Sequence, residues 1–222
     1  MGWQQAWYPV AYLRDLDPQR PTPFTLLEHD LVLWFDAASQ RWRAFADVCP
    51  HRLVPLSEGR LNGAGELECP YHGWQFDASG RCNHIPALGK GATVPPSAHL
   101  TPLRSVERFG LVWVSFEEPV CDLPDVPEWS NPDLQQIWLP PIVINAAAGQ
   151  FVDNFLDFGH FPFVHAGTFG SGEDEFITDY DVVKSGDGWS FVVDYPHTVH
   201  NNEDPLVATG EHPLVQPRNM TY

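Results

Sequence analysis

Short apolar runs separated by turn-forming residues dominate the first half of the chain. Three of these runs are long enough to be strands: residues 31–35, 42–46 and 111–116. Polar or glycine-containing segments with turn composition interrupt them, at residues 38–40, 62–65 and 77–80. Short runs bounded by turns are typical of antiparallel sheets. We therefore predict an antiparallel β-rich region from about residue 7 to residue 118.

An acidic, proline-rich segment follows this region. Residues 117–141 contain six acidic residues, no basic residue and six prolines. Proline at this density is incompatible with a helix or a central strand, so we predict a linker between two domains at residues 119–141. The alternative is a long surface loop within one domain. Domains are then expected at residues 1–118 and 142–222.

The pattern beyond the linker mixes both periodicities. We predict the start of a second sheet at residues 142–144, a helix at 150–159 and a strand at 189–195. The fold class is therefore α+β.

The composition restricts the partners that the protein could have. Twelve Lys and Arg against 29 Asp and Glu give a formal net charge of −17. This balance argues against nucleic acid or an anionic membrane surface as a partner, although it suits a basic redox partner. No run of about 18 apolar residues is present, so no membrane span is expected. The first 16 residues lack a continuous apolar region, and we expect no signal peptide.

Two short peptides carry the strongest chemical signal in the chain. Cys49-Pro50-His51 and Cys69-Pro70-Tyr71-His72 each supply one sulfur and one imidazole. Two thiolates and two imidazoles can hold a [2Fe–2S] cluster, with the cysteines on one iron and the histidines on the other. The alternative is a structural Cys₂His₂ zinc site, but its usual ligand order is Cys-Cys followed by His-His.

The remaining cysteines, Cys82 and Cys121, lie outside these peptides. We expect them to be free thiols, because iron chemistry and the absence of a secretory signal favour a reducing, cytoplasmic compartment.

A second constellation lies between residues 151 and 165. On a helix, the phenylalanines Phe151, Phe155 and Phe158 fall on one face and are expected to anchor it in a core. Asn154, Asp157 and His160 then fall on the other side. His160 and His165 would diverge on an unbroken helix, but Gly159 and Pro162 allow a break that brings both rings to one ion. Two histidines with a carboxylate are typical of mononuclear non-haem Fe(II) sites, although Asp157 could instead cap the helix or pair with His160.

Together these constellations resemble the oxygenase component of the Rieske non-haem iron oxygenases. The family motif C-x-H…C-x-x-H is present as Cys49, His51, Cys69 and His72, and N-x-x-D-x-x-H-x-x-x-x-H as Asn154, Asp157, His160 and His165. The flanking sequences CPHRLVPLSEGRL and CPYHGWQFDASGRC look most like the branch that includes pheophorbide a oxygenase-like enzymes, vanillate O-demethylase and dicamba monooxygenase. The resemblance covers about residues 7 to 170.

The resemblance implies a fold and a role for each matching residue. It implies an N-terminal antiparallel β-sandwich Rieske domain and the first part of an α+β helix-grip catalytic domain. Cys49 and Cys69 would bind one cluster iron, His51 and His72 the other, and His160 and His165 the mononuclear Fe(II). Asp157 would link His72 of one subunit to His160 of its neighbour in a homotrimer, and Asn154 would lie near the iron.

The resemblance also implies a third iron ligand, an Asp or Glu roughly a hundred residues beyond His165. The sequence reaches only Tyr222, so we expect a fragment or a truncated gene product. Asp194, Glu203, Asp204 and Glu211 are available carboxylates, but nothing in their spacing selects one.

The function implied is that of a terminal oxygenase. Electrons from a ferredoxin or flavin reductase would pass through the cluster to Fe(II), and O₂ would be used to hydroxylate or oxidatively demethylate an aromatic or cyclic organic substrate. The alternative is a Rieske-type electron-transfer protein without oxygenase activity. Carriers of the cytochrome-complex type usually have a further cysteine beside each motif, where this chain has Val54 and Tyr71.

Overall fold

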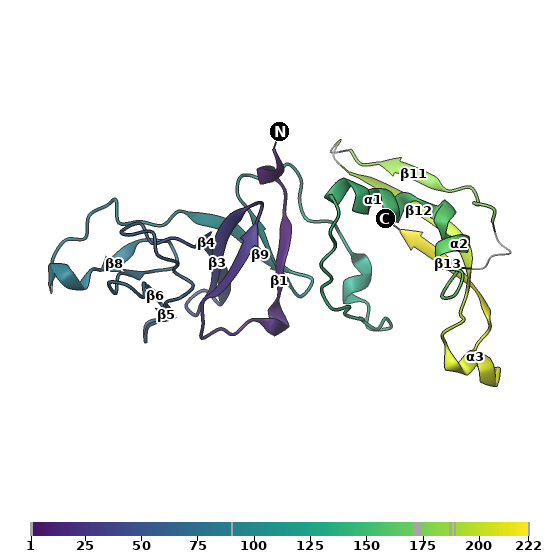
Figure 1. Cartoon of the computed structure of the whole chain (residues 1–222), viewed down its shortest axis with the longest axis horizontal. Coiled ribbons are helices and arrows are strands. Elements are labelled where there is room, and N and C mark those ends of the chain that lie inside the picture. Colours follow the sequence, from purple (N-terminus) through teal and green to yellow (C-terminus); the bar gives the residue numbers. More distant parts are fainter. Residues whose placement is uncertain (1, 90, 171–174, 187, 189, 222) are drawn as a thin grey trace. The chain divides into compact units, whose positions relative to one another are not determined.

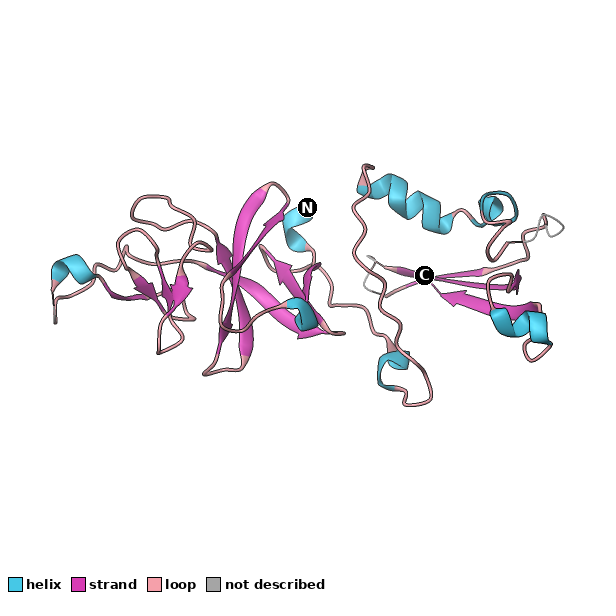
Figure 2. Cartoon of the chain, turned by 60° about the horizontal axis from the view of Figure 1, so that its bottom comes forward, coloured by secondary structure: helices cyan, strands magenta, loops and turns pink. Residues whose placement is uncertain are grey.

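The chain folds into two compact units, residues 1–135 and 136–222, in the computed structural model (Figure 1). The structure describes residues 2–89, 91–170, 175–186, 188 and 190–221. Strands dominate the first unit, and the second combines strands with short helices (Figure 2). The division between the units falls within residues 119–141.

A six-stranded antiparallel sheet forms the framework of the first unit. Its strands run in the spatial order β1 (Tyr8–Tyr12), β10 (Leu111–Ser115), β9 (Pro102–Arg108), β4 (Arg41–Ala46), β3 (His29–Asp36) and β2 (Thr22–Leu26). Three of these strands contain the apolar runs found in the sequence, which confirms the predicted antiparallel β-rich region.

Strand β3 supplies side chains to cores on both faces of this sheet. Its central residues alternate, so that Val32 and Trp34 enter one core while Leu33 enters the other. Trp34 is fully buried and stacks on Phe45 of β4, with ring centroids 4.3 Å apart. Because successive side chains of a strand point to opposite faces, a continuous apolar run predicts this burial on both sides.

A smaller antiparallel sheet packs into the core that contains Val32 and Trp34. It consists of β5 (Arg60–Leu61), β6 (Leu67–Glu68), β7 (Gln75–Phe76) and β8 (Cys82–His84), in that order. The β5–β6 turn is the one predicted at residues 62–65, and it closes with the Gly65 amide donating to the Asn62 carbonyl at 2.9 Å. Among its described residues, the unit also contains the 3₁₀ turns Trp3–Gln5, Leu13–Asp15, Pro86–Leu88 and Pro127–Ser130.

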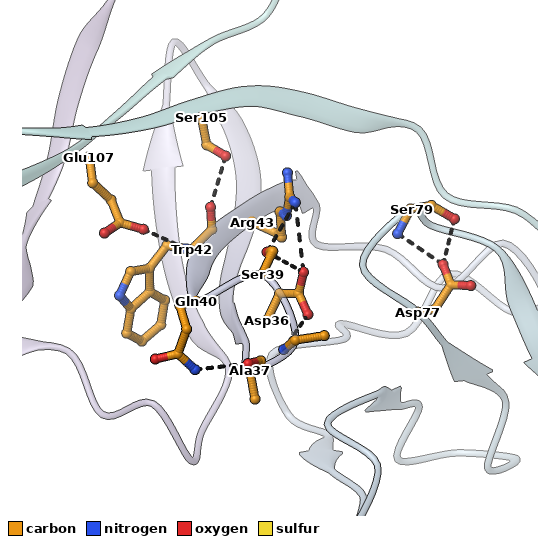
Figure 3. Close-up of polar contacts among 11 residues, drawn as sticks. Asp36, Ala37, Ser39, Gln40, Trp42, Arg43, Asp77, Ser79, Ser105 and Glu107 are labelled. Carbon is orange, nitrogen blue, oxygen red and sulfur yellow. Dashed lines mark hydrogen bonds and ion pairs between the residues drawn. The ribbon is translucent and has the colours of Figure 1, made fainter.

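Side chains replace backbone ladder bonds where β4 and β9 separate. These strands pair only at Ala44–Leu103 and Phe45–Pro102 among the described residues. Beside this pairing, the Trp42 amide donates to Glu107 Oε1 at 2.8 Å, and Ser105 Oγ donates to the Trp42 carbonyl at 2.9 Å (Figure 3). The backbone amide and carbonyl of Trp42 therefore both have hydrogen-bond partners, although Trp42 lies outside the β4–β9 pairing.

The Asp77 carboxylate organises the β7–β8 turn. Its Oδ1 accepts hydrogen bonds from Ser79 N at 2.9 Å and Ser79 Oγ at 2.6 Å (Figure 3). Oδ1 also accepts a hydrogen bond from Arg81 N at 3.2 Å, and Oδ2 accepts one from the Asn83 side-chain amide. Partial burial raises the pKa of Asp77, but these hydrogen bonds outweigh that effect and lower its pKa below the ordinary value of 3.8.

We expect Asp77→Ala to lower the free energy of unfolding by about 1–2 kcal/mol at pH 7. Because the folded-state pKa is depressed, the charged carboxylate stabilises the fold above the unfolded pKa, and this contribution is lost as the pH falls through the folded value. The difference in the free energy of unfolding between Asp77→Ala and the wild type should therefore be smaller at pH 3 than at pH 5. Urea denaturation at both pH values measures it, and a difference of constant size would contradict the charged role of Asp77.

The acidic, proline-rich segment is irregular apart from the 3₁₀ turn Pro127–Ser130, and its residues up to Gln135 belong to the first unit. Trp129 packs edge-on against Phe109, with ring centroids 5.5 Å apart, and Arg108 lies 3.5 Å from Asp125. Residues 142–144 do not open a sheet as expected. They form an exposed loop, because their backbone has no strand partner among the described residues.

The second unit pairs a three-stranded antiparallel sheet with short helices. The sheet has the order β11 (Asp181–Lys184), β12 (Phe191–His200) and β13 (Val215–Thr221), and the predicted strand at 189–195 corresponds to the start of β12, Trp189 itself lying outside the described residues. The helical elements are α1 (Ala148–Leu156), the 3₁₀ turn η5 (Phe158–His160), α2 (Phe161–Val164) and α3 (Pro205–Thr209). Within the described parts of the chain, no helix has the length and apolar character that a membrane crossing requires.

Candidate metal centres

The first candidate ligand loop, residues 49–54, is closed by its own backbone. The Cys49 amide donates to the Val54 carbonyl and the Leu53 amide donates to the Cys49 carbonyl, both at 2.9 Å. Leu53 closes the loop with φ of +58°, an unusual conformation for a residue with a side chain. These bonds hold the Cys49 thiol inside the core and leave His51 at the exposed tip.

The second loop, residues 69–74, repeats the same hydrogen-bond pattern. The Cys69 amide donates to the Trp74 carbonyl at 2.8 Å and the Gly73 amide donates to the Cys69 carbonyl at 3.1 Å. Gly73 has φ of +69° at the position that corresponds to Leu53. Two loops of the same geometry therefore present one buried sulfur and one exposed imidazole each.

The two loops bring like ligands together in pairs. The rings of His51 and His72 have centroids 4.6 Å apart. The Cys49 and Cys69 thiols are buried in the same core cluster, where Cys69 helps to raise the pKa of Cys49. Two imidazoles that bind one metal at about 2.1 Å place their ring centres roughly 4.5 to 5.5 Å apart. The histidine pair therefore fits one iron and the cysteine pair the other.

The surroundings of these ligands set their protonation in the metal-free chain. Burial, together with the neighbouring Cys69, raises the pKa of Cys49 to about 11. Desolvation and the nearby His72 and Arg52 lower the pKa of His51, which favours the neutral imidazole that binds metals. Trp74 stacks on the His51 ring with centroids 4.7 Å apart. Metal binding must therefore displace the thiol protons, as is general for cysteine ligands.

The described residues contain no group of three or more His, Cys, Asp or Glu side chains that could surround one metal ion. A zinc site needs all four ligands around a single ion, whereas a two-iron cluster needs only two pairs of ligands. The pairing of His51 with His72, and the burial of Cys49 and Cys69 in one core cluster, correspond to the like-with-like ligand pairs of a two-iron cluster. All four cysteines are free thiols, as expected for Cys82 and Cys121.

A break in the helix positions the second histidine pair. Helix α1 ends at Leu156, earlier than the expected Gly159, because Asp157 adopts an extended conformation and its side chain caps the next turn. Asp157 Oδ1 accepts a hydrogen bond from Gly159 N at 3.0 Å, and its Oδ2 lies 3.5 Å from His160 Nδ1. Asp157 thus caps the 3₁₀ turn η5 and also pairs with His160. Capping and pairing with His160 were the alternatives that the sequence left open for this residue.

His160 and His165 come together across this break. Their ring centroids are 5.2 Å apart, with planes inclined at 52°. This separation also lies in the range for two imidazoles on one metal ion. The His160 side chain is largely buried, at 15% exposure, and Asn154 is exposed in α1.

The expected anchoring by three phenylalanines is only partly correct. Phe158 is buried against Val193 and Tyr195 of β12, with its ring stacked on Tyr195 at 4.2 Å. Phe151 and Phe155 remain 43% and 45% exposed and pack against each other. The reason is the extended Asp157, which rotates Phe158 away from the face of α1 that carries the other two rings.

Sequence reasoning did not identify the aromatic residues around the second histidine pair. The Phe161 ring contacts both His160 and His165, with centroids 5.0 and 6.0 Å apart, and it lines a cavity of about 370 Å³ with Phe169 and Tyr195. The density of phenylalanines between residues 158 and 169 was the available signal, but it does not distinguish a core from the wall of a site.

Comparison with known proteins assigns both regions. The Rieske [2Fe-2S] domain family matches residues 6–106, and the Vanillate O-demethylase oxygenase C-terminal domain family matches residues 144–219. The chain belongs to the Rieske non-haem iron oxygenases. Members of this family carry a [2Fe–2S] cluster in the Rieske domain and a mononuclear iron in the catalytic domain, and both ligand sets described above fit these groups.

The similarity to individual Rieske oxygenases is substantial. Pheophorbide a oxygenase, chloroplastic, of Arabidopsis thaliana is 57% identical over 96 residues, which cover 43% of this chain and 17% of the relative. Methylxanthine N3-demethylase NdmB of Pseudomonas putida is 35% identical over 172 residues, covering 73% and 48%. The crystal structure of dicamba monooxygenase bound to dicamba superposes with a TM-score of 0.73 at 27% identity, covering 99% of this chain and 63% of that one. The chain spans less than half of the length of the two curated relatives.

Proposed function

We propose that the protein acts as a terminal oxygenase that hydroxylates or oxidatively demethylates an aromatic or cyclic organic substrate. The observation that carries this proposal is the presence of two histidine pairs, each with the spacing of two imidazoles on one iron, in the two matched domains. When bound, the cluster supplies single electrons and the mononuclear iron supplies the position at which O₂ reacts. Relatives named as demethylases and monooxygenases support the reaction class.

The ligand roles follow the pairing of the side chains. Cys49 and Cys69 would hold the buried iron of the cluster, and His51 and His72 the iron at the exposed tip. His160 and His165 would hold the mononuclear iron. The third ligand, an Asp or Glu, stays a prediction. Of the candidate carboxylates, Asp194 accepts a hydrogen bond from Asn219, and Asp204 caps α3 and binds His212.

Asp157 would connect the two centres between subunits of a homotrimer. Its side chain is 60% exposed although it touches His160, and His72 is exposed at the cluster tip. An exposed carboxylate that already contacts one imidazole can accept a hydrogen bond from a second imidazole, and the carboxylate then orients both rings. A ferredoxin or flavin reductase would deliver the electrons. The free thiols suit a reducing compartment, and the cytoplasmic location stays a prediction.

The test is substrate-dependent oxygen consumption by the cluster-loaded protein. With NAD(P)H, a ferredoxin and its reductase, we expect a panel of methoxylated aromatic acids and N-methylated purines to include a compound that accelerates O₂ uptake and releases formaldehyde. Reactions without substrate provide the control. A cluster that is reduced and reoxidised at the same rate with and without every compound would favour the electron-transfer alternative.

A further inference from the structure

We propose that Phe169 is a positioning residue that orients the His165 imidazole for metal binding. This inference rests on the proposed function, in which His160 and His165 hold the mononuclear iron. Phe169 lies four residues beyond His165 in the turn that follows α2, outside both sequence motifs.

The Phe169 ring lies against the face of the His165 ring. The two centroids are 4.5 Å apart and the planes are inclined by only 22°. The Phe161 ring meets Phe169 edge-on at 5.3 Å, and the guanidinium carbon of Arg218 in β13 lies 5.8 Å from its centroid. Phe169 is therefore held from several directions and cannot turn away from His165 without breaking other contacts.

The backbone of the turn fixes Phe169 relative to His165. The amides of Thr168 and Gly170 both donate to the His165 carbonyl, at 3.0 and 2.8 Å. The Phe169 carbonyl accepts a hydrogen bond from the His200 amide at the end of β12, at 3.1 Å. The turn is thus tied at one end to the histidine itself and at the other to the sheet.

Gly170 allows this close return of the chain. A Cβ atom at this position would lie 2.1 Å from the Phe161 carbonyl oxygen and 3.0 Å from that of His165. Only glycine lets the backbone pass between these groups, so the sequence Phe169-Gly170 specifies the geometry of the turn.

The stacked Phe169 ring gives the His165 imidazole an orientation that hydrogen bonds do not provide. Metal-binding imidazoles are usually oriented by a partner on the second ring nitrogen. Asp157 lies beside His160 in this way. Among the described residues, no hydrogen bond to the His165 ring is formed, and the stacked Phe169 takes the orienting role.

Cobalt(II) binding to the cluster-loaded protein tests the role of Phe169 without relying on turnover. We expect Phe169→Leu, which keeps apolar bulk but removes the ring face, to weaken Co(II) binding about tenfold. Phe169→Tyr keeps the face and should bind as the wild type does. Phe151→Leu, which removes a ring that packs on Phe155, is the matched control and should also be unchanged. In NMR spectra, the His165 ring protons should move downfield in Phe169→Leu only.

The outcomes separate this inference from the proposed iron site. If Co(II) binding is insensitive to both His160→Ala and His165→Ala, the proposed histidine site is wrong and the inference falls with it. If those variants abolish binding while Phe169→Leu binds normally, only the positioning role is overturned. Loss of the fold in Phe169→Leu, detected by tryptophan fluorescence, would show that Phe169 serves packing and would also overturn it.

Discussion

His72→Ala should bleach the reconstituted protein, whereas His160→Ala should keep its colour and lose oxygenase turnover. His72 faces His51 at 4.6 Å between ring centroids, and its loss leaves one cluster iron with a single imidazole ligand. His160 pairs instead with His165 in the other unit, at 5.2 Å, so its removal affects only the mononuclear site. Iron and sulfide analysis with the visible spectrum measures the first effect, and substrate-dependent O₂ uptake measures the second.

A surface histidine provides the control for this comparison. His99 is exposed, and His99→Ala should leave both the cluster and turnover unchanged. Equal loss of cluster in His72→Ala and His160→Ala would contradict the existence of two separate centres. Retention of full colour in His72→Ala would remove His72 from the set of cluster ligands.

Gly80→Ala should destabilise the first unit by about 3 kcal/mol. Gly80 has φ of +87°, and an added Cβ would lie 1.9 Å from the Leu100 carbonyl oxygen and 3.1 Å from the Phe45 ring. Both the backbone conformation and the lack of space therefore oppose a side chain at this position. Urea denaturation of the metal-free protein, followed by the fluorescence of the buried Trp34 and Trp42, measures the loss.

Gly65→Ala separates the two causes of this loss. Gly65 has a similar φ of +78°, but no atom lies within 4 Å of an added Cβ. We expect this control to cost about 1 kcal/mol, the typical cost of a side chain in the left-handed region. If Gly80→Ala and Gly65→Ala lowered the free energy of unfolding by the same amount, the close approach of Gly80 to Leu100 would not contribute to the loss of stability.

The ligand loops were largely predictable because their geometry is local. Each loop is closed by hydrogen bonds that span at most six residues, so the peptides around Cys49 and Cys69 carry the information for their own shape. The antiparallel strands were predictable for a related reason, since a side-chain period of two and flanking turns are local properties. The pairing of His51 with His72 was inferred from chemistry, and the small β5–β8 sheet brings the two loops together.

The second histidine site was harder to predict because it depends on contacts that are distant in the sequence. Asp157 ends α1 early and rotates Phe158 onto β12, where it stacks on Tyr195. The acidic segment was also only partly predicted as a linker, because its residues up to Gln135 belong to the first unit, where Trp129 packs on Phe109. Neither contact follows from helical periodicity or composition.

By itself, the sequence determined the candidate metal ligands, the order of their two sets along the chain and the antiparallel character of the first unit, because short-range patterns encode them. Only the tertiary structure decided which aromatic rings support His165, where α1 stops and which phenylalanines are buried. These features depend on close packing between segments separated by many residues, such as Phe169 with Arg218, and the free energy of such contacts is not contained in any local pattern.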